Sequence, residues 1–143
     1  MVWRMQSFVD KTLDSRWLWL VARILLALVF LSSGLAKLLD FQGGLAEMRA
    51  AGLEPEWLFN IATITVLLGG SMLLLLDRAL WLGTGALAVF LLLTIFVVHH
   101  FWALPEAQAK TAMFWALEHI SLIGGLVAAA IASHLRSQLE GKA

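Results

Sequence analysis

Residues 17–39 read WLWLVARILLALVFLSSGLAKLL and contain only two charged side chains, Arg23 and Lys37. A helix needs about 20 mainly apolar residues to cross the hydrocarbon layer of a bilayer, and this stretch is long enough. Because hydrocarbon cannot hydrogen-bond to an open backbone, a segment this apolar is expected to cross as a helix. The stretch therefore predicts a membrane-spanning helix. A cleaved signal peptide is not expected, because a long polar segment precedes residue 17 and Arg23 interrupts the apolar centre.

The composition of the whole chain is also typical of a membrane protein. Hydrophobic residues make up 61% of the 143 residues and charged residues 14%, whereas soluble domains are about half apolar and about a quarter charged. The formal net charge is zero, so the lipid bilayer is the expected partner and nucleic acid is not. Cysteine is absent, which excludes disulfides and thiolate metal sites within this subunit.

Three further stretches are long and apolar enough to span, at residues 57–76, 79–101 and 112–133. The second and third spans are joined by Asp77 and Arg78 alone, which predicts a tight hairpin. The longest link, residues 40–56, is expected to be a short helix on the membrane surface, with a plain loop as the alternative. We predict an all-α fold, an integral membrane antiparallel four-helix bundle that forms a single domain over residues 1–143. Small residues that permit close helix approach occur in every span: Ser32, Ser33, Gly34, Gly69, Gly70, Ser71, Gly83, Gly85, Gly124 and Gly125.

The distribution of lysine and arginine predicts the orientation, because cytoplasmic loops carry an excess of these residues. One side of the predicted membrane layer has three: Lys37, Arg49 and Lys110. The other side has six: Arg4, Lys11, Arg16, Arg78, Arg136 and Lys142. Both termini are therefore expected to be cytoplasmic.

Five polar side chains interrupt the outer ends of these spans. His99 and His100 lie in FVVHHFW, residues 96–102, Glu118 and His119 lie in the fourth span, and Lys37 ends the first. Ionisable residues inside a membrane are costly and are functional-site candidates by default. Since consecutive helical residues point about 100° apart, only one of the two adjacent histidines is expected to face the interior. We predict an outward-facing candidate pocket formed by Lys37, His99, His100, Glu118 and His119, with Asn60 and Thr63 as further candidates.

Three ligand chemistries are open for this pocket, beside the simpler interpretation that the histidines are ordinary interfacial residues. A quinone headgroup needs hydrogen-bond donors near the lipid interface, and aromatic residues such as Trp102 and Trp115 lie close by in the sequence. Paired histidines on different spans could also hold a haem, although the sequence does not distinguish axial ligands from other histidines. A metal would take imidazole and carboxylate ligands, here His99, His100, Glu118 and His119, although their spacing matches no recognised motif.

Arg23 is the remaining intramembrane charge, in the cytoplasmic third of the first span. Such a residue normally faces the bundle interior or extends its long side chain to the headgroups. Two interpretations therefore stay open, an ion pair with Asp77 or contact with lipid phosphate.

Residues 22–54, ARILLALVFLSSGLAKLLDFQGGLAEMRAAGLE, resemble the opening of the DoxX family of small bacterial and archaeal membrane proteins. The resemblance extends over roughly residues 21–132. This chain departs from the family pattern at Val66, where members often carry a glutamate, and at Glu118 and His119, where members often carry Lys-Asn. The matching positions are Arg23, Gly34, Lys37, Gly43 or Gly44, Met48, Gly52, Gly69, Gly70, Arg78, the HHFW stretch and the ISLIGG stretch.

The resemblance implies four transmembrane helices in the bacterial inner (plasma) membrane and a relation to subunits of a quinone-linked oxidoreductase. We therefore expect an accessory subunit of a membrane redox system, acting with a redox partner protein or as a homo-oligomer, rather than a stand-alone enzyme. The alternatives are a non-catalytic membrane anchor or scaffold for a partner protein, and a small transporter or metal-handling protein.

Overall fold

The computed structural model describes residues 2–141, and every regular element within this range is helical. Four segments are long and apolar enough to cross a membrane: α2, α4, α5 together with the turn that follows it, and α6. The predicted all-α membrane fold is therefore confirmed. The elements are α1 (Val2–Leu13), α2 (Arg16–Leu39), α3 (Phe41–Ala50), α4 (Glu56–Leu76), α5 (Leu80–Val97), the 3-10 turn η1 (Phe101–Ala103) and α6 (Glu106–Glu140).

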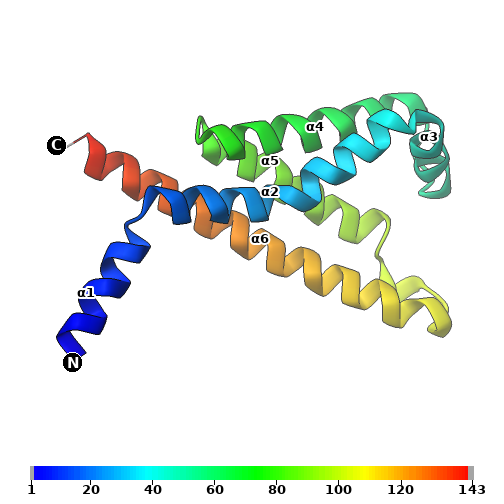
Figure 1. The fold of residues 1–143 in the computed structure, drawn as a ribbon. Helices are drawn as coiled ribbons and strands as arrows, with labels where there is room; N and C mark the ends of the chain where they lie inside the picture. Colours follow the sequence, from blue (N-terminus) through cyan, green and yellow to red (C-terminus); the bar gives the residue numbers. More distant parts are fainter. Residues whose placement is uncertain (1, 142–143) are drawn as a thin grey trace.

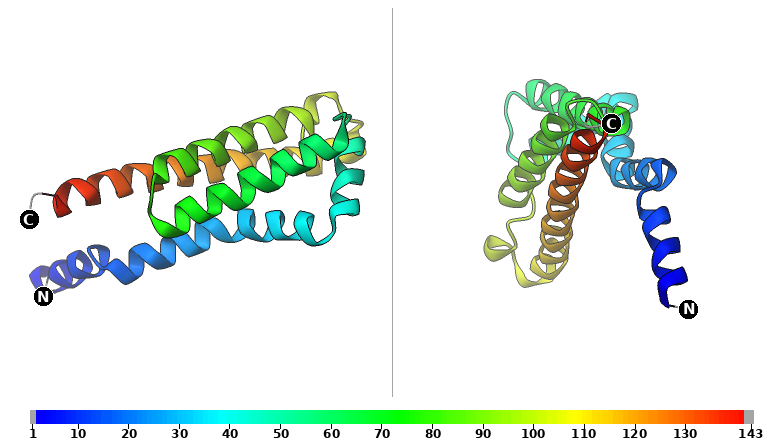
Figure 2. Two further views of the ribbon diagram at one scale, coloured as in Figure 1. Left: turned by 90° about the horizontal axis from the view of Figure 1, so that it is seen from above. Right: turned by 90° about the vertical axis from the view of Figure 1, so that its left-hand side faces the viewer.

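The four long helices pack in chain order, with α2 against α4, α4 against α5, and α5 against α6 (Figure 1). Both chain ends and the α4–α5 turn lie at one end of the molecule, which we call the terminal end (Figure 2). Helix α3 and η1 lie at the opposite end, which we call the α3 end. Contact between α2 and α6 is sparse, and the two helices diverge toward the α3 end (Figure 1).

Local sequence explains where the helices begin and end. Helix α3 starts after Asp40, whose Oδ1 accepts a hydrogen bond of 2.9 Å from the backbone N–H of Gly43, as expected for an N-cap residue. Helices α4 and α6 begin directly after Pro55 and Pro105, whose missing N–H groups cost nothing at a helix start. Helix α4 ends at Leu76, and the next residue, Asp77, adopts the left-handed conformation with φ of 53°, a common way to end a helix.

Two elements differ from the sequence-based expectation. Helix α1 is amphipathic and projects away from the other helices (Figures 1 and 2). Its 12 residues are too few to cross a bilayer, which takes about 20. Helix α6 has 35 residues, roughly 50 Å at 1.5 Å per residue. It continues beyond the predicted span 112–133 at both ends. Because the hydrocarbon layer is only about 30 Å thick, the ends of α6 extend outside it.

A central apolar core holds the spans together. Its fully buried side chains include Leu67 and Leu74 of α4, Leu87 of α5 and Leu126 of α6. Close approach depends on only some of the predicted small residues, because Gly69, Gly85 and Gly124 have open space where a side chain would be. Those at true contacts are Gly34 against α4, Gly70 against Leu87, and Gly83 against Gly70.

We predict that Gly83→Ala destabilises the protein, because the added Cβ would lie 2.9 Å from the carbonyl oxygen of Gly70 and 2.8 Å from Cβ of Leu73. The free energy of unfolding should fall by about 1–3 kcal/mol, the usual cost of overpacking. Thermal unfolding in a mild detergent measures the change. Gly85→Ala on the same helix is the matched control and should be neutral or stabilising, since nothing lies within 4 Å; equal losses in both variants would contradict the α4–α5 contact.

Candidate functional site

Two of the five predicted pocket residues meet at the α3 end. The rings of His99 and His119 contact edge to face with centroids 5.0 Å apart, and Trp115 stacks on His99 at 6.2 Å. Trp115 and His119 are four residues apart on α6 and therefore share one helix face. His119 is half-buried, and its Nδ1 is fully enclosed without a hydrogen-bond partner.

His100 has different surroundings from His99. Its Nδ1 lies 3.1 Å from the carbonyl oxygen of Val97, and its ring is 6.4 Å from that of Trp102. Since a carbonyl oxygen only accepts hydrogen bonds, Nδ1 is the nitrogen that carries the proton. The two adjacent histidines thus separate, with the ring of His99 packed against α6 and His100 bonded to its own segment. The predicted third span reaches residue 101, but α5 ends at Val97, so both histidines lie in the link after the helix and helical spacing does not set their directions.

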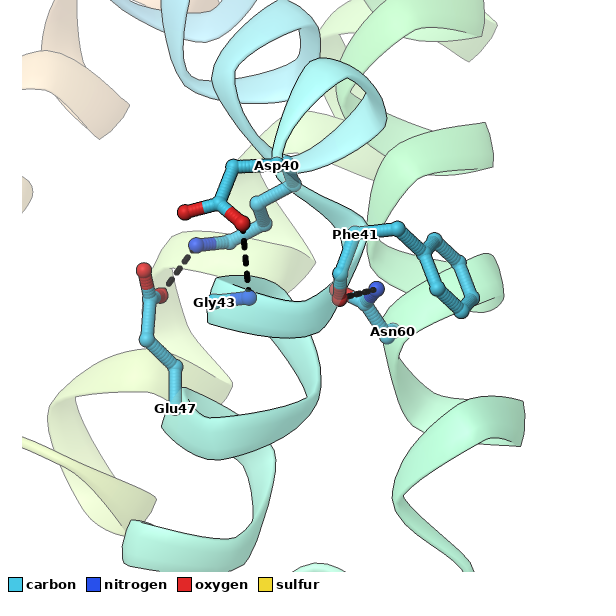
Figure 3. A network of polar contacts seen from close by, with 6 residues as sticks. Asp40, Phe41, Gly43, Glu47 and Asn60 are labelled. Carbon is cyan, nitrogen blue, oxygen red and sulfur yellow. Dashed lines mark hydrogen bonds and ion pairs between the residues drawn. The ribbon is translucent and has the colours of Figure 1, made fainter.

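Glu118 and Lys37 do not join the histidine pair. Glu118 is exposed on the outer surface of α6. Lys37 forms an ion pair with Glu47 of α3, and Asp40 caps α3 beside it (Figure 3). Lys37 therefore ties α2 to α3 instead of reaching toward α6.

Asn60 also serves the attachment of α3. It is fully buried on α4, and its Nδ2 donates to the carbonyl oxygen of Phe41 at 3.5 Å (Figure 3). Its amide lies 2.5–2.9 Å from where a Cβ on Gly44 would be, so a glycine is required at that contact. An ion pair between Arg49 and Glu56, 3.0 Å long, adds a second link between α3 and α4.

A second polar cluster, centred on Asp77, occupies the terminal end. Asp77 Oδ2 accepts a hydrogen bond of 2.7 Å from Trp19 Nε1 of α2, and Oδ1 accepts one of 2.7 Å from Ser133 Oγ of α6. One carboxylate at the α4–α5 turn therefore connects α2, α4 and α6. Sequence reasoning missed this cluster, although Trp19, Asp77 and Ser133 lie at similar depth near the ends of their spans.

Within residues 2–141, Arg23 forms no ion pair with Asp77, the first of the two arrangements expected from the sequence. Its Nη1 donates to the carbonyl oxygens of Leu75 at 2.7 Å and Leu74 at 3.5 Å, and the guanidinium lies 5.3 Å from the ring centre of Trp19. The last carbonyls of a helix lack backbone partners and carry partial negative charge. Arg23 therefore satisfies the end of α4, and within residues 2–141 the ion pairs are Lys37–Glu47 and Arg49–Glu56.

The terminal end also contains a polar cavity of about 320 Å³. Helix α2, the α4–α5 turn and α6 all contribute to its lining. In contrast, the described part of the chain brings together no group of three or more His, Asp or Glu side chains that could hold a metal ion.

Together, the apolar spans and their buried polar links define a multi-pass α-helical membrane protein. The DoxX family model matches residues 18–100, and the chain belongs to the DoxX family. The matched range runs from α2 to the end of the third span, so α6 and His119 lie outside it. No curated protein and no solved structure gives a significant match.

We predict that Asp77→Asn destabilises the protein, because the amide oxygen can accept from only one of Trp19 and Ser133, and a neutral amide forms weaker hydrogen bonds than the carboxylate that it replaces. Asparagine tolerates the left-handed backbone at this position, so the loss should come from the side chain and amount to about 1–3 kcal/mol. Unfolding of Asp77→Asn, Trp19→Phe and the double variant should give a coupling energy of about 0.5 kcal/mol or more. Arg78→Gln, an exposed neighbour, is the control, and additive effects of the pair would contradict the shared hydrogen bond.

Proposed function

We propose that the protein is a membrane subunit of a quinone-linked or other redox system in the bacterial inner membrane. In this proposal, His99 and His119 bind a quinone-like headgroup. The observation that carries it is the enclosed Nδ1 of His119, which has no partner beside the ring of His99. An unpaired buried polar atom costs about 1–3 kcal/mol. In this proposal the ring of His119 turns to expose Nδ1, and a ligand group that then bonds to this atom recovers that energy.

The chemistry of the pair suits a quinone. A neutral imidazole offers one N–H donor and one acceptor nitrogen, and quinone and quinol oxygens use both. Ligand sites are mainly apolar with a few polar groups that fix orientation, and Trp115 stacked on His99 provides an aromatic wall. Trp102 and Phe114 nearby are exposed, as in the aromatic belts that lie at headgroup level.

The remaining candidates have secondary roles in this proposal. His100 and Glu118 adjoin the pair in sequence but direct their side chains elsewhere, so they belong at most to the rim. Lys37 acts through α3, whose position it fixes with Glu47.

The proposed orientation places the histidine pair on the outer side and both termini in the cytoplasm. Most of the positive charges considered above lie at the terminal end, on α1, the start of α2, the α4–α5 turn and the end of α6. Lys142, which also entered the sequence-based count, lies outside the described residues. The positive-inside rule then assigns the terminal end to the cytoplasm.

We predict that His119→Leu weakens binding of the soluble quinone analogue decylubiquinone to the purified protein by about tenfold, the effect of losing roughly 1.4 kcal/mol. Quenching of tryptophan fluorescence measures the binding. His99→Leu should behave likewise. His100→Leu is the matched control on the same segment and should bind as the unchanged protein does.

Two results would contradict the proposal. One is the absence of saturable binding, and the other is equal affinity in His119→Leu and His100→Leu. A protein that binds no quinone but purifies with a second polypeptide would instead fit the anchor or scaffold function.

A further inference from the structure

The polar cavity at the terminal end is rich in arginine. Arg16 and Arg23 come from α2, Arg136 comes from α6, and Trp19 lies between them with the guanidinium groups of Arg23 and Arg136 at 5.3 and 5.9 Å from its ring centre. Stacking on an indole face leaves the positive charge of a guanidinium available. Three positive charges are therefore gathered around one cavity.

Two carboxylates, those of Asp77 and Glu140, line this cavity beside the three arginines, but neither forms an ion pair with them. Each oxygen of Asp77 accepts a hydrogen bond from a neutral group, one from Trp19 and the other from Ser133. Glu140 is exposed at the rim. No carboxylate in residues 2–141 lies within ion-pair distance of the three arginines, and the Nε of Arg23 is enclosed without any acceptor. The cavity thus carries an excess of positive charge that an anion would complement.

An apolar cavity of about 340 Å³ adjoins the polar one and shares Trp19 and Arg136 with it. The rest of its lining is aliphatic, with Leu13 from the end of α1, Leu18 and Ala22 from α2, and Ala132 and Leu135 from α6. A polar space joined to an apolar one matches an amphiphile rather than a small soluble ion. Both volumes are within the range of about 300–1,000 Å³ that is usual for ligand sites.

We propose that these two cavities form a binding site for an anionic phospholipid. The phosphate lies among Arg16, Arg23 and Arg136, and an acyl chain lies along Ala22, Ala132 and Leu135. Guanidinium groups bind phosphate oxygens in a bidentate manner, and basic pockets between spanning helices are recognised sites for acidic headgroups. The depth is appropriate, because Arg16 and Trp19 begin a spanning helix where headgroups are expected.

The test compares phosphatidylglycerol with phosphatidylcholine of identical acyl chains, titrated into the purified full-length protein in neutral detergent and followed by native mass spectrometry. The unchanged protein should retain one phosphatidylglycerol more tightly than phosphatidylcholine. Arg136→Gln and Arg16→Gln should each weaken phosphatidylglycerol binding about fivefold, since one arginine near a lipid phosphate contributes roughly 1 kcal/mol. Arg78→Gln is the matched control, as it removes an exposed positive charge from the same end but does not line either cavity.

A second comparison separates a lipid from free phosphate. Ala132→Phe fills the apolar cavity without changing the charge and should also weaken phosphatidylglycerol binding, while inorganic phosphate should not displace the lipid. Displacement by inorganic phosphate, with no effect of Ala132→Phe, would overturn the lipid assignment. Equal retention of the two lipids, or equal effects of Arg136→Gln and Arg78→Gln, would overturn the site itself.

Discussion

Hydrocarbon offers no hydrogen-bond partner, and the rest of this structure depends on that constraint. Backbone groups are paired inside helices. Buried hydroxyls donate to backbone carbonyls one turn earlier in the same helix, as Ser71 does to Leu67 and Thr84 to Leu80. Arg23 follows the same rule, since it donates to carbonyls that the end of α4 leaves free. The intramembrane charge thus completes a neighbouring helix, which explains how an arginine is tolerated at this depth.

The same constraint divides the molecule into two polar ends around an apolar centre. At the α3 end, Lys37, Asp40 and Asn60 attach a short helix. The His99–His119 pair joins the link after α5 to α6. At the terminal end, Asp77 connects three helices beside an arginine-lined cavity. Because α2 and α6 touch only lightly, the Asp77 contacts are a principal link between the first and last spans.

Hydropathy predicts much of this fold, because a spanning helix needs a length of apolar sequence that few other elements have. The α4–α5 turn at Asp77 and the start of α6 after Pro105 can be recognised in the same way. Helix α1 cannot, since an amphipathic helix of this length carries no spanning signal. Of the glycines, Gly70 and Gly83 lie at contacts while Gly69 and Gly85 do not, and composition alone does not distinguish them because helix rotation decides which face is buried.

The candidate site is less predictable than the fold. The shared face of Trp115 and His119 follows from helical geometry. The separation of His99 from His100 does not, because α5 ends at Val97 and both histidines lie in the link after it. The placement of Lys37 beside the histidines could not be corrected from sequence, because its partner Glu47 comes within reach only when α3 folds back beside α2. The Asp77 cluster and the cavity around Arg23 depend on how α2 and α6 cross, which no local pattern encodes. The position of a polar residue along a predicted span gives its depth in the membrane. Which polar residues meet at that depth depends on how the helices pack.

The central claim is that the four long helices cross the bilayer and leave both chain ends on one face. Its most direct test uses the absence of cysteine. Single cysteines are placed at four exposed glutamines: Gln6 and Gln138 at the terminal end, and Gln42 and Gln108 at the α3 end. A membrane-impermeant thiol reagent added to intact cells should label Gln42→Cys and Gln108→Cys, whereas Gln6→Cys and Gln138→Cys should react only after the membrane is opened. Labelling of Gln6→Cys and Gln138→Cys from opposite faces would contradict the account.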